Sequence, residues 1–336
     1  MGKLKYLANR VREMDFTALA DTAGRVAARS KKTRLTAMLD IVWCGLRYQA
    51  GYMDYDVFHL ERANGRQRKT YITRGVNNGF VKRLNDPAYV HLFSNKDEFN
   101  AAFSEFLGRD WMRIEENGGE AFAQWLEGKA SIIAKPRDGM CGKGVEKLVP
   151  ADFADTDELF RYLLAHQIGL VEECLRQHGE MNRLYPDSVN TARIVTIRLH
   201  DKAQVVCAYL RIGNGGVVDN FNSGGMLTRI DVQTGALLYD AVDKAGTAYA
   251  VHPVTGTPIR GFVVPNWDDC LKLAIRAAGV VPQIGYVGWD VASTPDGPVL
   301  VEGNEFPGHD IYQMPAHTPD NYGLLPLFQA VLQDKA

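Results

Sequence analysis

Residues 285–307, GYVGWDVASTPDGPVLVEGNEFP, have the pattern of a β-hairpin, and this stretch decides our prediction of the fold. Two runs rich in Val and Leu, 285–294 and 298–304, flank the sequence PDG at 295–297. Proline, aspartate and glycine in that order have the chemistry of a three-residue hairpin loop. The pattern therefore predicts two antiparallel strands joined by a tight turn.

The predicted pairing brings polar side chains together. If Thr294 and Pro298 close the loop, Asp290 lies directly across from Glu302. Asn304 is two residues further along and so shares their face. Like charges opposite each other destabilise an antiparallel pair, so the arrangement needs a cation or a solvated face. Because Mg²⁺ prefers oxygen ligands, we interpret these three residues as a magnesium site, with an exposed acidic face as the alternative.

The composition is that of an ordinary globular protein. The chain has 336 residues, of which 46% are hydrophobic and 23% are charged, so it can form two or three subdomains. A net charge of −2 provides no overall field that would favour nucleic acid. Residues 1–34 hold nine Lys or Arg and three acidic residues, a surplus of six. We interpret this segment as an exposed helical face, with a docking surface for an acidic partner or a membrane as the alternative.

The cysteines indicate a reducing compartment. They are odd in number and far apart, and they form no metal-ligand spacing: Cys44, Cys141, Cys174, Cys207 and Cys270. The N-terminus lacks the continuous apolar stretch of a signal peptide, and the apolar runs are short. We therefore expect a cytoplasmic protein with no membrane span.

The apolar periodicity changes along the chain and predicts three regions of an α+β protein. Helical spacing dominates at the start, and long β segments begin near residue 192. The predicted regions are an N-terminal helical and mixed region (1–90), a small lobe with a glycine-rich loop (91–180) and a C-terminal lobe with the metal site (181–336).

A glycine-rich loop follows the first predicted strand of the small lobe. The segment SIIAKPRDGMCGKGVEKL (131–148) places Lys135 at the end of a strand and Gly139, Gly142 and Gly144 after it. Backbone N–H groups of such a loop can bind phosphate oxygens, and the lysine adds a positive charge. The spacing matches neither GxxxxGK[ST] nor GxGxxG, and a plain surface turn is the alternative.

Two arginines lie in mostly apolar β segments of the C-terminal lobe. A charged residue in such a setting usually has a partner, and phosphate or carboxylate would serve Arg193 and Arg211. Structural ion pairs are the alternative. Asn220 opens the sequence NFNSGG (220–225), where glycines let the backbone approach a ligand closely. The sequence LVEECL (170–175) is similar to a hinge strand that pairs with a purine edge, or else it is a buried strand end with solvated glutamates.

The order of these features resembles the ATP-grasp superfamily. Within it, NTARIVTIR, AYLRIG, VDNFNSGG and GWDVASTPDGPVLVEGN look like the sugar-transfer-associated ATP-grasp family, over about residues 40–330. The resemblance implies the ATP-grasp fold, in which two α+β lobes grip ATP between antiparallel sheets, here with an N-terminal helical region. The set of Asp290, Glu302 and Asn304, written D…ExN, is similar to the magnesium site of those ligases.

The resemblance also implies roles for individual residues and the cofactors ATP and magnesium, for which manganese can substitute. The implied nucleotide contacts are Lys96, Lys135, Gly139, Gly142, Gly144, Glu172, Glu173, Cys174, Leu175 and Glu180. Lys96 is a loose match, and a solvated lysine at a helix start is its alternative. The residues implied to steady the γ-phosphate and the acyl phosphate are Arg193, Arg211 and Asn220, while Asp290, Glu302 and Asn304 hold magnesium. Gly288 stands where some amino-acid ligases of the superfamily carry a catalytic arginine.

These roles imply an ATP-dependent carboxylate–amine ligase that works through an acyl phosphate. The substrates would be a small or carrier-linked carboxylate and an amine, in polysaccharide or natural-product biosynthesis. A kinase that phosphorylates a hydroxyl and a nucleotide-binding scaffold for glycosyltransferases are the alternatives. His309 is interpreted as a structural histidine, or as a contact to the acceptor. A biosynthetic partner protein or a homodimer is left open.

Overall fold

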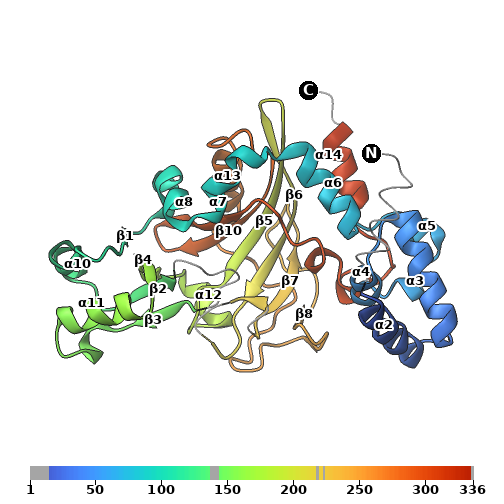
Figure 1. Ribbon diagram of the computed structural model, residues 1–336, viewed down its shortest axis with the longest axis horizontal. Coiled ribbons are helices and arrows are strands. Elements are labelled where there is room, and N and C mark those ends of the chain that lie inside the picture. The colour runs from blue at the N-terminus through green and yellow to red at the C-terminus, as the bar shows by residue number, and fades with distance from the viewer. Residues whose placement is uncertain (1–14, 137–143, 217–218, 222–223, 334–336) are drawn as a thin grey trace. The chain divides into compact units, whose positions relative to one another are not determined.

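The computed structural model describes residues 15–136, 144–216, 219–221 and 224–333. The fold class is α+β, as expected, with helices and two antiparallel sheets (Figure 1). Contacts divide the chain into one unit of Met1–Lys82 with Gly308–Ala336 and a second unit of Arg83–Pro307. The boundaries expected at residues 90 and 180 stay a prediction. Among the described residues, no helix is both long and apolar enough to cross a bilayer.

The first unit is helical. Its described elements are α2 (Phe16–Arg29), α3 (Arg34–Tyr48), α4 (Tyr52–Val57), η1 (Leu60–Arg62), α5 (Gly65–Arg68), η5 (Ile311–Gln313), η6 (Pro315–His317) and α14 (Leu325–Gln333), and α6 (Arg74–Leu84) begins in it. The side chains of Asp15 and Thr33 cap α2 and α3 by accepting from backbone N–H groups, which supports helix starts at these positions. Helices α2, α3 and α4 share a core that includes Leu19, Val26 and Ile41.

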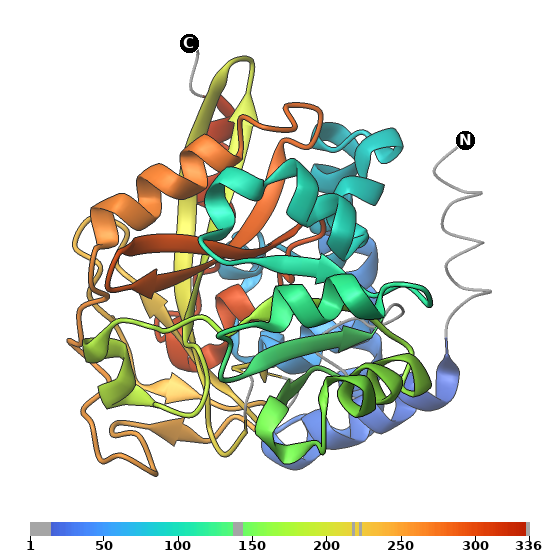
Figure 2. The same ribbon diagram turned by 90° about the vertical axis from the view of Figure 1, so that its left-hand side faces the viewer.

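The second unit contains a small lobe built on a four-stranded sheet of order β1-β4-β2-β3. The unit begins with η2 (Pro87–Tyr89), α7 (His91–Ser94), α8 (Lys96–Ala102) and α9 (Ser104–Leu107), whose Phe93, Phe99 and Phe106 belong to the same core as Trp289. The elements of the small lobe are β1 (Trp111–Arg113), α10 (Gly119–Leu126), β2 (Ile132–Pro136), β3 (Glu146–Leu148), η3 (Pro150–Asp152), α11 (Thr156–Ala165) and β4 (Ile168–Glu173). Ile132, Ala134 and Val171 pack with residues of α10 and α11, and Figure 2 shows this lobe in green facing the viewer. Because side chains alternate along a strand, Lys135 and Glu172 project from the opposite face.

The large lobe is built on a seven-stranded antiparallel sheet of order β11-β10-β5-β6-β7-β8-β9. Its elements are α12 (Gly179–Leu184), β5 (Thr191–Leu199), β6 (Lys202–Ile212), β7 (Met226–Ile230), β8 (Ala241–Val242), β9 (Ala248–Tyr249), α13 (Trp267–Ala277), β10 (Tyr286–Thr294) and β11 (Gly297–Asn304). Ile194, Leu210 and Trp289 belong to the core on one face, together with Trp267 and Leu273 of α13. Residues of alternate positions, including Arg193 and Asp290, therefore share the other face.

The β10–β11 hairpin has the predicted Asp290–Glu302 pair but a different turn. Thr294 pairs with Gly297, so the loop has two residues and the prediction of a three-residue loop was wrong. Gly297 has a φ of +117°, a backbone conformation that residues other than glycine rarely adopt. A β-bulge then shifts the register between Asp290 and Val291, and beyond it Asp290 lies opposite Glu302. The shorter turn and the extra residue compensate each other.

Candidate active site

Three neighbouring strands bring the predicted charged residues to one face of the large sheet. Arg193 of β5 pairs with Asp290 of β10 on one side and with Tyr209 of β6 on the other. Arg211 is two residues beyond Tyr209, so its side chain shares this face. Residues that are about 100 positions apart in the chain are thereby placed next to each other.

Asp290 is the centre of this cluster. Its carboxylate is buried and accepts hydrogen bonds from Nε of Arg193, from Nη2 of Arg193 at 2.7 Å and from Nη1 of Arg211 at 2.5 Å. Burial by itself raises the pKa of a carboxyl group, but the charges of Arg193 and Arg211 lower the pKa of Asp290 to about 2. Asp290 is therefore ionised and holds both arginines in place.

Glu302 and Asn304 complete the predicted metal set. The Glu302 side chain is 54% exposed, and its Oε1 lies 3.6 Å from Nη2 of Arg193. Partial desolvation and then the negative charge of Asp290 raise the pKa of Glu302. Nδ2 of Asn304 donates to Oε1 of Glu302 at 3.3 Å and to the carbonyl oxygen of Gly288 at 3.4 Å. The structure thus brings the three oxygen-bearing side chains together at the end of the hairpin.

This donor set fits a magnesium ion in its chemistry. The described residues contain no group of three or more His, Cys, Asp and Glu side chains that could hold a metal. Magnesium, however, is commonly held by one or two carboxylates while nucleotide phosphates and water complete its shell. Two carboxylates and an amide meet this need, and a divalent cation would offset the repulsion that raises the pKa of Glu302.

Asp219 is a member of the cluster that the sequence reasoning missed. Its Oδ1 lies 3.1 Å from Nη2 of Arg211, and its Oδ2 accepts from the backbone N–H of Thr191 at 2.9 Å. Burial is the main reason why the pKa of Asp219 is raised. The feature of the sequence that could have identified Asp219 is its position directly before Asn220 in VDNFNSGG. Asn220 is buried, and its carbonyl oxygen accepts from the backbone N–H of Gly225 at 3.1 Å.

The backbone at Gly288 lies beneath the side chain of Arg193. A Cβ atom at Gly288 would lie 2.9 Å from Cδ of Arg193 and 3.4 Å from Cβ of Pro307. A side chain at position 288 would therefore displace the arginine that binds Asp290. The packing of Arg193 therefore favours glycine at position 288.

A second charged cluster lies on the face of the small sheet opposite to the one that packs on α10 and α11. Oε2 of Glu172 is 2.7 Å from Nζ of Lys135 and 2.8 Å from Nε of Arg109, and its Oε1 accepts from Nδ2 of Asn100 at 2.9 Å. Glu172 is 3% exposed, and although burial acts in the opposite direction, Lys135 and Arg109 lower its pKa to about 2. Glu172 therefore fixes the lysine rather than facing solvent.

Arg109 was also missed, because it lies outside every motif. Its Nη1 donates to the carbonyl oxygen of Leu300 at 2.7 Å, and its Nη2 donates to that of Val301 at 3.2 Å. These carbonyls flank the extra residue of the β11 bulge. Arg109 therefore connects the hairpin of the large lobe to Glu172 of the small lobe.

Glu173, Cys174 and Leu175 lie at the end of β4 and directly after it. The backbone N–H of Glu173 donates to the carbonyl oxygen of Asp110 at 2.9 Å, while Cys174 and Leu175 are half-buried. Glu180 is exposed in the first turn of α12 and pairs with Arg183 at 2.6 Å. Gly144 has a φ of +75°, whereas Gly139 and Gly142 lie outside the described residues.

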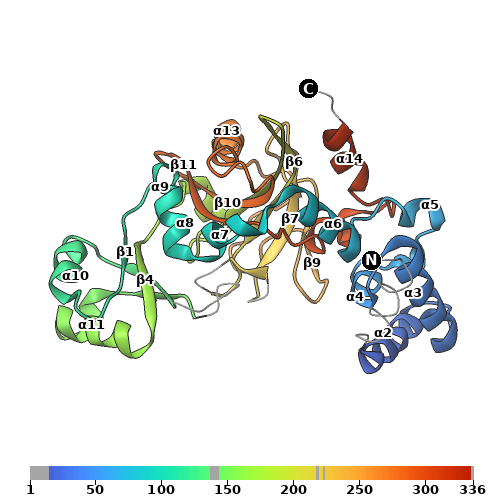
Figure 3. The ribbon, with the colours of Figure 1, turned by 45° about the horizontal axis from the view of Figure 1, so that its top comes forward.

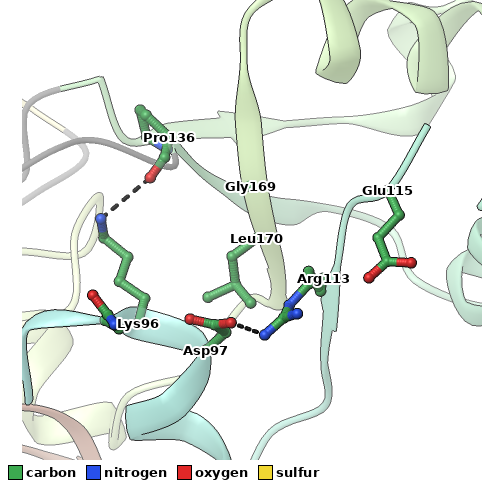
Figure 4. A pocket seen from close by; sticks show the side chains of 8 residues that line it. Lys96, Asp97, Arg113, Glu115, Pro136, Gly169 and Leu170 are labelled. Atoms are coloured by element: carbon green, nitrogen blue, oxygen red, sulfur yellow. Dashed lines mark hydrogen bonds and ion pairs between the residues drawn. The ribbon is translucent and has the colours of Figure 1, made fainter. Parts of the chain in front are cut away.

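A pocket of about 350 Å³ lies beside the end of β2 (Figure 4). It is lined by Asn95, Lys96, Asp97, Arg113, Glu115, Pro136, Gly169 and Leu170. Nζ of Lys96 donates to the carbonyl oxygen of Pro136 at 3.2 Å, and Arg113 forms an ion pair with Asp97. Leu170 pairs with both Lys135 and Arg113, so the pocket opens on the sheet face that carries Lys135. His309 belongs to the first unit, where its Nε2 lies 2.8 Å from Oδ1 of Asp54.

Comparisons with known proteins found a family model and a set of similar solved structures. A family model described as "Sugar-transfer associated ATP-grasp" matches residues 76–331. Among solved structures, the ATP-grasp ligase PsnB, complexed with minimal precursor, Mg and ADP, is 18% identical, with a TM-score of 0.42, covering 80% of this chain and 68% of that chain. The L-amino acid ligase from Bacillus licheniformis is 13% identical, with a TM-score of 0.42, covering 72% of this chain and 48% of that one. The D-cycloserine synthetase DcsG is 14% identical, with a TM-score of 0.40, covering 75% and 76%. No curated protein matches the sequence.

Proposed function

Since the chain belongs to the sugar-transfer-associated ATP-grasp family, we propose that it is an ATP-dependent ligase that joins a carboxylate to an amine through an acyl phosphate. The observation that carries this proposal is the cluster on the large sheet, where Asp290 holds Arg193 and Arg211 beside Glu302. Two fixed guanidinium groups next to two carboxylates can bind phosphate oxygens and a cation at the same place.

The residues of the two charged clusters have different roles in the proposed reaction. Asp290, Glu302 and Asn304 would hold Mg²⁺, which when bound neutralises charge on the phosphates of ATP. Lys135 of the small lobe, which Glu172 holds in place, would bind phosphate oxygens of ATP. Lys96 would contact the nucleotide from the lining of the pocket beside β2. Arg193 and Arg211 would stabilise the negative charge that develops as the γ-phosphoryl group moves to the substrate carboxylate.

The proposed chemistry has two steps. A carboxylate oxygen of the substrate attacks the γ-phosphorus, the bond to the β-phosphate oxygen breaks, and ADP leaves. The amine nitrogen then attacks the acyl carbon, the bond from that carbon to the phosphate oxygen breaks, and phosphate leaves as the nitrogen loses a proton. We propose a small or carrier-linked carboxylate as the donor, in polysaccharide or natural-product biosynthesis, and the cytoplasm as the compartment.

The experiment that tests the ligase is trapping with hydroxylamine. The protein is incubated with ATP, Mg²⁺, hydroxylamine and a panel of carboxylates, and we expect a hydroxamate together with ADP and phosphate for at least one acid. The matched control is Glu302→Gln, which should form on the order of 10²-fold less hydroxamate. A stable phosphoester on a hydroxyl compound would show a kinase instead, and nucleotide binding without turnover across the panel would favour the scaffold.

A further inference from the structure

Helix α3 has apolar side chains on two opposite sides. Ala37, Ile41 and Cys44 are buried in the core that it shares with α2 and α4. The opposite side exposes five large apolar side chains, which we call the outer α3 face: Leu35 (66% exposed), Leu39 (61%), Val42 (37%), Trp43 (56%) and Leu46 (55%). A helix with apolar side chains on two sides is normally covered on both of them.

The outer α3 face is one continuous stripe. Leu35, Leu39, Val42 and Leu46 follow each other at intervals of four, three and four residues, which places them along one side of a helix. Figure 3 shows α3 beside α2 and α4 in the first unit. Phe16 of α2 (63%) and Met53 of α4 (68%) are also exposed. An exposed apolar stripe such as the outer α3 face marks a binding site for a protein or a membrane.

The exposed charges on this helix are positive. Arg34 and Arg47 are exposed at its two ends, and the exposed Lys31 lies in the turn that precedes it. Asp40 is the single acidic residue of α3, and its carboxylate is bound by Arg68 at 2.7 Å and by Lys32. Residues 1–14 add Lys3, Lys5, Arg10 and Arg12 to this cationic part of the sequence against one acid, Glu13. The exposed charges of α3 and its preceding turn are therefore cationic, with the guanidinium of Arg34 lying beside Gly24 of α2.

These charges argue against a second copy of the chain as the occupant. In an antiparallel contact between two α3 helices, Arg34 of one chain would lie near Arg47 of the other. In a parallel contact, each arginine would lie near the same arginine of the other chain. Like charges at such a contact are unfavourable, and Asp40 is already bound. An anionic surface has the complementary charge, and leucines with a tryptophan between terminal arginines are typical of a helix lying in a membrane interface.

We propose that the outer α3 face docks on an anionic lipid surface, with α3 parallel to the plane of the membrane. Leu35, Leu39, Trp43 and Leu46 enter the boundary between headgroups and acyl chains, while Arg34 and Arg47 contact anionic headgroups. The opposite side of α3 stays packed on α2 and α4, so that the fold of the first unit does not change. This docking is independent of the reaction proposed above.

The test is vesicle binding by the full-length protein. Co-sedimentation is measured with vesicles of phosphatidylcholine alone and of phosphatidylcholine mixed with phosphatidylglycerol. We expect binding to the mixed vesicles that weakens as salt is added. Leu39→Ser combined with Trp43→Ser should weaken it on the order of tenfold or more, and Arg34→Gln combined with Arg47→Gln should lower the preference for phosphatidylglycerol.

The control variant is Val254→Ser, which removes an apolar side chain of similar exposure (63%) from another part of the chain. It should bind vesicles like the wild type, and the unfolding midpoint of every variant should match the wild type because the substituted side chains are exposed. Equal vesicle binding by the Leu39/Trp43 variant and the wild type would overturn the proposal. So would a dimer, seen by light scattering, that this variant abolishes while vesicle binding is absent.

Discussion

Asp290 and Glu302 lie directly opposite each other across β10 and β11, yet their environments differ. Asp290 is buried between two arginines and its pKa is lowered to about 2, whereas Glu302 is half exposed and its pKa is raised. The two carboxylates predicted to bind the same cation therefore differ in their surroundings: ion pairs with two arginines stabilise the charge of Asp290, whereas Asp290 repels the charge of Glu302. Substitutions at the two positions should separate metal binding from stability.

Glu302→Gln should preserve the fold and remove magnesium-dependent turnover. The change relieves repulsion with Asp290, so the free energy of unfolding should stay within about 1 kcal/mol of the wild type. ATP turnover at saturating Mg²⁺ should fall on the order of 10²-fold, because one ligand charge is lost. Denaturant unfolding and ADP release measure the two effects. Unaltered turnover at every Mg²⁺ concentration would contradict the assignment of Glu302.

Asp290→Asn should destabilise the protein as well as inactivate it. It leaves Arg193 and Arg211 buried without the carboxylate that both contact, and breaking a buried pair in this way costs about 3 kcal/mol or more. A double-mutant cycle with Arg193→Gln measures the coupling, and the double variant should lose less stability than the sum of the single variants. Additive losses would show that the ion pair contributes nothing.

Asp219→Asn should lower turnover through Arg211. The substitution keeps an oxygen for the N–H of Thr191 but removes the charge that Arg211 contacts. We expect kcat to fall about tenfold with little change in the KM for ATP, since the arginine is misplaced rather than lost. Asp201→Asn, at a fully exposed carboxylate, is the matched control. A variant with wild-type kcat would rule out a positioning role for Asp219.

Lys96→Met should raise the KM for ATP on the order of tenfold, because Lys96 lines the pocket on the side of the sheet that carries Lys135. Lys272→Met removes an exposed lysine of α13 and should leave this KM unchanged. Initial rates of ADP release over a range of ATP concentrations give both values. If the two variants behave alike, Lys96 is a solvated lysine at a helix start.

Stability should fall in acid through Glu172. Its pKa is lowered from 4.5 to about 2 in the folded protein, so its contribution is present above pH 4.5 and is lost as the pH falls from there toward 2. The shift corresponds to roughly 3 kcal/mol. Glu172→Gln should be less stable than the wild type at neutral pH and should show a flatter decline between about pH 5 and pH 3. Urea unfolding at a series of pH values measures this, and parallel curves for the two proteins would contradict it.

The alternation of side chains made part of the site visible in the sequence. In a strand every second residue shares a face, so the predicted hairpin was enough to place Glu302 and Asn304 on one face. The predicted pairing of Asp290 with Glu302 is also correct, although the structure reaches it through a shorter turn and a bulge. The same periodicity indicated that Arg193 and Arg211 were charged residues in mostly apolar strands that needed partners. These features depend on local spacing, and local spacing is what a sequence records directly.

Only the tertiary structure decided which partners these charges have. The pairing of Asp290 with Glu302 follows from a two-residue turn and a bulge, and Arg109, 191 residues away from Leu300, binds the carbonyls at that bulge. Asp219 reaches Arg211, and Glu172 fixes Lys135, through packing that brings distant segments together. A buried charge is stable only where a partner from elsewhere in the chain meets it, and that meeting depends on the fold as a whole.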